Sequence, residues 1–147
     1  MSSPESVLDG NSRCQPAIST QLFAPTFSTQ QLKTVSPISL AYIGDAVFEL
    51  YVRSLLLMPA KRIRDYHQQV VGQVKAEQQA QHLDAIMPYL TDAEKEVLRR
   101  GRNATTGRNR RGSVRDYQKS TGFEALVGFL YLSNQARLEE LLQQLSI

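Results

Sequence analysis

Two acidic residues each interrupt an apolar segment that is long enough to form a helix. Asp45 and the adjacent Gly44 lie within LAYIGDAVFELYV (residues 40–52), and Glu124 lies within STGFEALVGFLYL (residues 120–132). An ionised carboxylate among apolar neighbours is costly unless it is paired, hydrogen-bonded or bound to a metal. Asp45 is therefore either an ordinary solvent-facing side chain or a carboxylate held in a pocket for a chemical purpose.

The neighbours of Glu124 favour a close contact between these two segments. At helical spacing Glu124 shares its face with the small residues Ser120, Thr121 and Gly128. A face of small residues lets another helix approach closely, and Gly44 offers a matching gap, so both carboxylates could reach one divalent cation. Oxygen ligands without cysteine or clustered histidine favour magnesium or manganese over zinc. Buried acids that pair with arginine or cap a helix are more common, and the pattern leaves both interpretations open.

Other titratable residues have ordinary explanations. Arg53 follows Glu49 by four residues, which is the favourable order for an ion pair along a helix, so Glu49 is assigned a structural role. His67 and His82 lie in a glutamine-rich segment and are expected on its solvent-facing side, not as general bases.

Start and stop signals along the chain predict an all-α fold. Capping boxes at residues 28–31 and 91–94 begin two short helices, the second of which closes with basic residues and Gly101. Ser36 and Pro37 begin a helix that can extend to residue 58. Further helices are expected at residues 63–87 as one helix or two, at about 117–132, and at 134–145. No segment alternates as a strand does.

Composition predicts one domain with an N-terminal tail. Residues 1–27 hold three of the six prolines, five serines and no periodic apolar pattern, which is typical of a disordered or loosely attached segment. We expect the domain to occupy residues 28–147. The single cysteine, Cys14, cannot form an internal disulfide, which favours a reducing compartment such as the cytoplasm. No run approaches the roughly 20 apolar residues of a membrane span, so no membrane partner is expected.

The two acidic segments resemble a known family. LAYIGDAVFELYV is similar to the signature helix of the ribonuclease III family, and STGFEALVGFLYL is similar to its second acidic helix. RGRNA (residues 100–104) and KAEQQA (residues 75–80) resemble the compact Mini-ribonuclease III branch, which consists of the catalytic domain without a double-stranded-RNA-binding domain. The likeness covers about residues 32–145. It implies the helical endonuclease fold of that family, with Asp45 and Glu124 as the magnesium-binding catalytic pair.

Two positions depart from the full-length enzymes of that family. Ala41 and Thr121 stand where the longer enzymes carry additional acids, and the compact branch is expected to share this reduced set. The number of tightly bound metals therefore stays open, since water, backbone or RNA phosphate must complete the coordination. The implied reaction is metal-assisted hydrolysis of a phosphodiester bond that leaves a 5′-phosphate and a 3′-hydroxyl.

A basic stretch precedes the Glu124 segment. Residues 99–115 contain seven arginines and no acid, which indicates either a solvated loop or a contact with phosphate. Phosphate contacts confer affinity and register but little sequence choice, and the A-form shape of the RNA does most of the selecting. A single lysine, Lys75, is a weaker candidate. The predicted RNA-binding residues are Lys75, Arg99, Arg100, Arg102, Asn103, Arg108, Arg110 and Arg111.

The resemblance implies a homodimeric endoribonuclease that cuts double-stranded RNA and matures the precursor of large-subunit ribosomal RNA, in bacterial cytoplasm or a plastid stroma. A first alternative is a related domain that binds structured RNA without cutting it, which the residues Ala41 and Thr121 keep open. A second alternative is a helical scaffold whose arginines engage an acidic protein. A salt-sensitive preference for duplex RNA is expected of the endoribonuclease and of the RNA-binding domain, but not of the scaffold.

Overall fold

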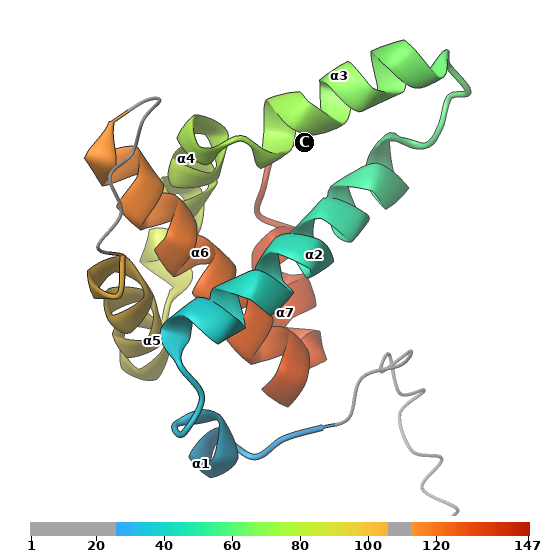
Figure 1. Ribbon diagram of the computed structural model, residues 1–147. Helices are drawn as coiled ribbons and strands as arrows, with labels where there is room; N and C mark the ends of the chain where they lie inside the picture. The colour runs from blue at the N-terminus through green and yellow to red at the C-terminus, as the bar shows by residue number, and fades with distance from the viewer. Residues whose placement is uncertain (1–25, 106–112) are drawn as a thin grey trace, which may run out of the picture.

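The computed structural model describes residues 26–105 and 113–147 (Figure 1). Its helices are α1 (Thr29–Leu32), α2 (Pro37–Leu56), α3 (Ile63–Val74), α4 (Ala76–Ile86), the 3₁₀ turn η1 (Met87–Tyr89), α5 (Asp92–Asn103), α6 (Val114–Ser133) and α7 (Gln135–Leu142). These two ranges contain no strand, so the all-α class is confirmed. None of the helices described here is both long and apolar enough to span a membrane.

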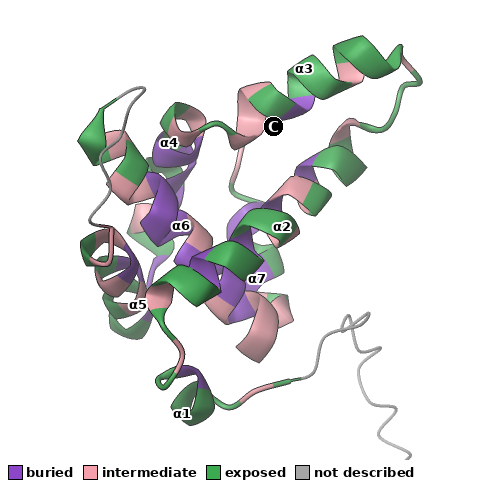
Figure 2. Ribbon diagram, viewed as in Figure 1, coloured by how far each residue is buried: buried purple, intermediate pink, exposed green. Residues whose placement is uncertain are grey.

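Helix α6 is the centre of the fold. Helices α2, α4, α5 and α7 pack against it (Figure 1), and the buried residues of α6 lie in its middle, between residues 120 and 130 (Figure 2). The main core joins Phe48 and Val52 of α2 to Leu83 of α4 and to Phe123 and Leu126 of α6. A helix that is covered on several sides must carry apolar or small residues around most of its circumference, as α6 does.

The predicted helix starts are confirmed by their hydrogen bonds. The Ser28 hydroxyl accepts from the N–H of Gln31 at 3.1 Å, and the Gln31 side chain accepts from the N–H of Ser28 at 2.9 Å. Thr91 and Glu94 make the same reciprocal pair at 3.2 and 2.9 Å. The Ser36 side chain caps α2. Each of these bonds satisfies a backbone donor that the first helical turn leaves free.

Gly101 does not end α5, and this prediction was wrong. The helix continues to Asn103, and Gly101 is buried against α6, where an added Cβ would lie 2.8 Å from the Cβ of Ala125. The glycine allows close packing of two helices and makes no turn. As a consequence Arg102 and Asn103, which were expected in a loop, are helical.

The segment 63–87 forms two helices, which was one of the two forms expected. Lys75 has an extended backbone (φ −63°, ψ 153°) and separates α3 from α4. Helix α3 packs mainly against α2 and leads away from the helices around α6 (Figure 1). Lys75 is thus an exposed corner residue between two helices.

Helix α2 is buried on one side and exposed on the other. Leu40, Phe48 and Val52 lie in the core, but Tyr42 is 81% exposed and Leu50 is 67% exposed. The apolar run therefore supplies two faces, of which α6 and its neighbours cover one. Several large apolar side chains of α2 are therefore left in solvent.

An ion pair anchors α7 to α5. Arg137 donates to both carboxylate oxygens of Glu94 at 2.9 Å and to the carbonyl of Tyr89 at 2.6 Å. Burial by itself would raise the pKa of Glu94, but the hydrogen bonds from Arg137 and Thr91 outweigh it and lower that pKa. The Glu94 carboxylate therefore closes the capping box of α5 and also holds α7.

Candidate active site

Two glycines bring the backbones of α2 and α6 into direct contact. A Cβ added to Gly44 would fall 1.7 Å from the carbonyl oxygen of Glu124, and one added to Gly128 would fall 2.0 Å from the carbonyl oxygen of Leu40. Only residues without a side chain fit at such a crossing. The small face around Glu124 and the gap at Gly44 therefore match as the sequence predicted.

This crossing places the carboxyl groups of Asp45 and Glu124 side by side. Burial in the first place, and then the neighbouring Asp45 carboxylate, raise the pKa of Glu124 to about 8. Asp45 is exposed and Glu124 is partly buried. The sequence left open whether Asp45 faces solvent or a pocket. In the structure Asp45 is exposed and lies beside Glu124, which the fold partly encloses.

A cluster of three rings fixes the helices that carry these carboxylates. Phe48 of α2 and Phe123 of α6 meet edge to face, with ring centroids 5.0 Å apart and planes at 88°. His82 of α4 packs edge-on against Phe48 at 5.7 Å. His82 is only 3% exposed, and burial lowers its pKa, so its predicted place on the solvent-facing side was wrong. Its imidazole is a neutral packing group that joins α4 to the other two helices.

Gln79 and Ser120 also lie at the site, although neither was predicted to be a functional residue. Gln79 is fully buried, its Oε1 accepts a hydrogen bond from the Ser120 hydroxyl, and its amide faces the Glu124 carboxyl. One sequence signal was present: Gln79 shares a helical face with Leu83 and Ile86, both of which are core residues. A glutamine at a core position requires a partner.

The donor set of the site fits a hard divalent cation with few protein ligands. Within residues 26–105 and 113–147 no group of three or more His, Cys, Asp or Glu side chains could hold a metal. Two adjacent carboxylates remain, one of them exposed to solvent, and oxygen donors of this kind suit magnesium or manganese. Glu49 pairs with Arg53 at 3.1 Å, as predicted, and so has a separate role.

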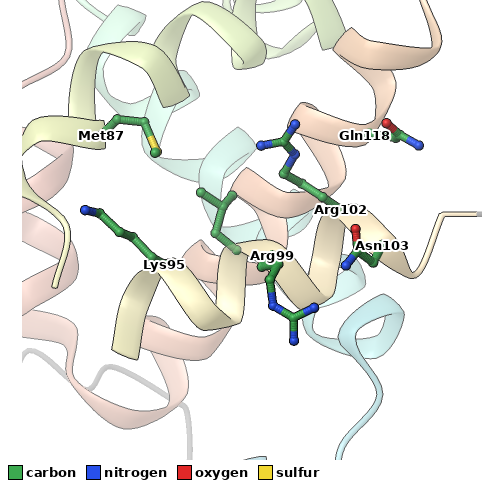
Figure 3. A pocket seen from close by; sticks show the side chains of 7 residues that line it. Met87, Lys95, Arg99, Arg102, Asn103 and Gln118 are labelled. Atoms are coloured by element: carbon green, nitrogen blue, oxygen red, sulfur yellow. The ribbon is translucent and has the colours of Figure 1, made fainter. Parts of the chain in front are cut away.

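The predicted basic residues do not form a single surface. Lys95, Arg99, Arg102 and Asn103 of α5 line a hollow of about 280 Å³ together with Met87, Leu98 and Gln118 (Figure 3). In Figure 3 the guanidinium of Arg102 points toward the space between Met87 and Gln118, whereas that of Arg99 points away. The lining residues include neither Asp45 nor Glu124.

The remaining basic candidates lie elsewhere. Arg99 is paired with Glu96 at 2.5 Å, and Arg100 lines a separate, mostly apolar hollow beside α1. Lys75 is exposed at the corner between α3 and α4. Arg108, Arg110 and Arg111 lie outside the described residues.

Known proteins share both the sequence and the fold. The protein-family model of the ribonuclease III domain matches residues 38–135 of the sequence. A Mini-ribonuclease 3 from Synechocystis sp. is 56% identical over 111 residues, which are 76% of this chain and 78% of that protein. A Mini-ribonuclease 3 from Synechococcus sp. is 46% identical over 145 residues, 98% of this chain and 96% of that protein. The X-ray crystal structure of a Fusobacterium nucleatum protein matches with a TM-score of 0.71 and 26% identity, over 76% of this chain and 93% of that one.

The helical fold and the match to the ribonuclease III domain thus define a nuclease domain of the ribonuclease III class. The chain belongs to the ribonuclease III family, in its Mini-ribonuclease III branch. It is an endoribonuclease.

Proposed function

We propose that the protein hydrolyses phosphodiester bonds of double-stranded RNA with magnesium, held by Asp45 and Glu124, and that manganese can substitute. The observation that carries the proposal is the glycine contact between α2 and α6, which fixes these two carboxylates next to each other.

Each carboxylate has a distinct task in this proposal. Glu124 is partly buried and oriented from within the fold, so it is the fixed ligand; Asp45 is exposed and faces both solvent and incoming RNA. Their mutual repulsion, which contributes to the raised pKa of Glu124, is relieved when a cation lies between them. When bound, the cation supplies electrophilic stabilisation of the phosphate and lowers the pKa of a water molecule.

Basic side chains of α5 support contact with the RNA backbone. Lys95 and Arg102 line one hollow and make no ion pair within the described parts of the chain. Such groups recognise phosphate and the shape of an A-form duplex, and they confer little sequence preference. We include Lys75, Arg99, Arg100, Asn103, Arg108, Arg110 and Arg111 as further candidates for the same role.

The exposed apolar face supports a homodimer. Tyr42 and Leu50 of α2, Met58 after it and Ile63 at the start of α3 are large apolar residues that this chain leaves in solvent. Large apolar side chains that lie together in solvent are typical of a protein–protein interface. A two-fold dimer would present two carboxylate pairs to the two strands of one duplex. Sedimentation of the purified protein, with Leu50→Lys as the disrupting variant, tests the dimer directly.

The natural substrate in this proposal is the precursor of large-subunit ribosomal RNA, and the compartment is the bacterial cytoplasm or a plastid stroma. The support is the family membership of the chain and the bacterial origin of its relatives. Incubation of precursor ribosomal RNA with the protein, followed by mapping of the cut ends, distinguishes this substrate from duplex RNA in general.

The decisive experiment is cleavage of a long labelled duplex RNA in magnesium by the wild type, Asp45→Asn and Glu124→Gln, with RNA binding measured in parallel. We expect both variants to bind RNA and to lose cleavage. Glu49→Gln is the matched control, because it removes a carboxylate of the same helix that pairs with Arg53, and it should still cut. A wild type that binds duplex without cutting it would favour the alternative of an RNA-binding domain with a weakened metal site.

A further inference from the structure

The side chain of Gln79 is fully buried beside the candidate active site, although amides are rarely buried completely. Its Oε1 is satisfied by the Ser120 hydroxyl. Its Nε2 has no hydrogen bond of standard geometry in the described part of the chain. A buried amide donor without a well-formed hydrogen bond is costly, so the presence of glutamine at this position needs an explanation.

The free donor faces Glu124. Ser120 and Glu124 are four residues apart on α6 and so lie on one helical face, and Gln79 of α4 is positioned against both of them. Because the Ser120 hydroxyl donates to Oε1, the orientation of the amide is fixed with its NH₂ group toward the carboxylate. An amide donor also favours the ionised form of Glu124, opposing the effects of burial and of Asp45.

The chemistry of the donor matters as much as its position. None of the ion pairs recorded among the described residues involves Asp45 or Glu124. A lysine or arginine in place of Gln79 would neutralise the carboxylates and compete with a cation for them. A neutral amide orients a carboxylate and leaves its negative charge available to a metal.

We infer that Gln79, held by Ser120, is the positioning residue that orients the Glu124 carboxylate for the divalent cation. This inference rests on the proposed function, since it assigns to Glu124 the role of a metal ligand. Gln79 acts through Glu124 and touches neither RNA nor cation in this scheme.

The test compares Gln79→Met, Ser120→Ala and the double variant with the wild type. Methionine keeps the length and volume of glutamine and removes both amide groups. Gln81→Met is the matched control, because it makes the same chemical change at an exposed position of the same helix. Binding of Mn²⁺ is measured by calorimetry without RNA, and cleavage of duplex RNA is measured as a function of magnesium concentration. Urea unfolding in EDTA monitors the fold of each variant.

We expect Gln79→Met to weaken Mn²⁺ binding about 10- to 100-fold and to raise the magnesium concentration at half-maximal cleavage by a similar factor. Ser120→Ala should give a smaller loss, and the double variant should match Gln79→Met, because Ser120 acts only through the amide. Binding of RNA in EDTA should be unchanged. Gln81→Met should behave as the wild type in every assay.

Three results would overturn the inference. The first is a Gln79→Met variant that loses stability but keeps the Mn²⁺ affinity of the wild type, which would make Gln79 a packing residue. The second is a double variant whose losses are the sum of the single ones. The third is a wild type that binds no Mn²⁺, and of the three results this one alone also removes the proposed function. If the wild type cleaves duplex RNA and Asp45→Asn does not, the proposed function holds, whether or not the Gln79 variants change Mn²⁺ binding.

Discussion

Substitution of Gly44 by alanine tests the geometry on which the site depends. The added Cβ would lie 1.7 Å from the carbonyl oxygen of Glu124 and 2.9 Å from the backbone nitrogen of Gly128. Relief of these contacts requires α2 and α6 to separate by roughly 1.8 Å, because non-bonded heavy atoms find their optimal contacts near 3.5 Å. Overpacking costs about 1–3 kcal/mol when flexible side chains can adjust, and here the opposing atoms are backbone.

The helix propensity of alanine offsets only part of this cost. Alanine is favoured over glycine within a helix by about 1 kcal/mol, so we expect the free energy of unfolding to fall by about 2–3 kcal/mol in Gly44→Ala. Separation of the helices also moves Asp45 relative to Glu124, and a misplacement of about 1 Å can lower a rate on the order of 100-fold. Cleavage of duplex RNA should therefore drop by that order even in folded protein.

Gly72→Ala is the control for this prediction. Gly72 lies within α3, and no heavy atom approaches within 4 Å of the Cβ it would gain. Its substitution should raise the free energy of unfolding by up to about 1 kcal/mol and leave cleavage unchanged. Urea unfolding and single-turnover cleavage measure both variants. A Gly44→Ala protein that is as stable and as active as the wild type would refute the close backbone contact and the argument built on it.

Three further predictions follow from the charged residues. Glu94→Gln should destabilise the protein by about 3 kcal/mol, because it leaves Arg137 without its main partner. Since the pKa of Glu94 is lowered in the folded protein, the wild type should lose this contribution as pH falls below about 4.5. Urea unfolding at several pH values checks both expectations. Glu124 keeps its proton up to about pH 8 in the folded protein and only to about pH 4.5 in the unfolded protein, so the folded form binds more protons between these values. The free energy of unfolding in EDTA should therefore fall as the pH rises from about 4.5 to about 8. Glu124→Gln should remove that slope, and a slope that persists contradicts the assignment. Arg102→Gln should weaken binding of duplex RNA, and the slope of log K against log salt concentration should become shallower by about 0.7–0.9 if the side chain neutralises one phosphate. An unchanged slope would mean that Arg102 does not contact the RNA.

The parts of the fold that local chemistry determines could be predicted from the sequence. The capping boxes at Ser28 and Thr91 each contain both members of a reciprocal hydrogen bond within four residues, and both helices begin where the residues indicate. The break near Lys75 could not be decided, because the segment has no proline or capping side chain there. The end of α5 could not be decided either, because a glycine often ends a helix but also allows another helix to pack closely against it.

The candidate site was predictable in its acids and not in its surroundings. The small residues on one face of α6 and the gap at Gly44 indicated which helices meet. Which face of α2 lies in solvent could not be read from a segment with so many apolar residues, so the sequence left open whether Asp45 faces solvent or a pocket. The burial of His82 and Gln79 depends on α4 packing against α6, a contact between segments about 40 residues apart that no local pattern records.

The meeting of α2 and α6 through main-chain atoms has a consequence for how this protein tolerates change over generations. A spacing set by interlocking side chains drifts whenever one of them is replaced, because each new side chain brings its own size and rotamers. The spacing at Gly44 and Gly128 is set by carbonyl oxygens and amide nitrogens, which every amino acid carries alike. Exchange of an interior residue such as Leu126 for another apolar residue should therefore change the distance between the two acids less than replacement of either glycine does.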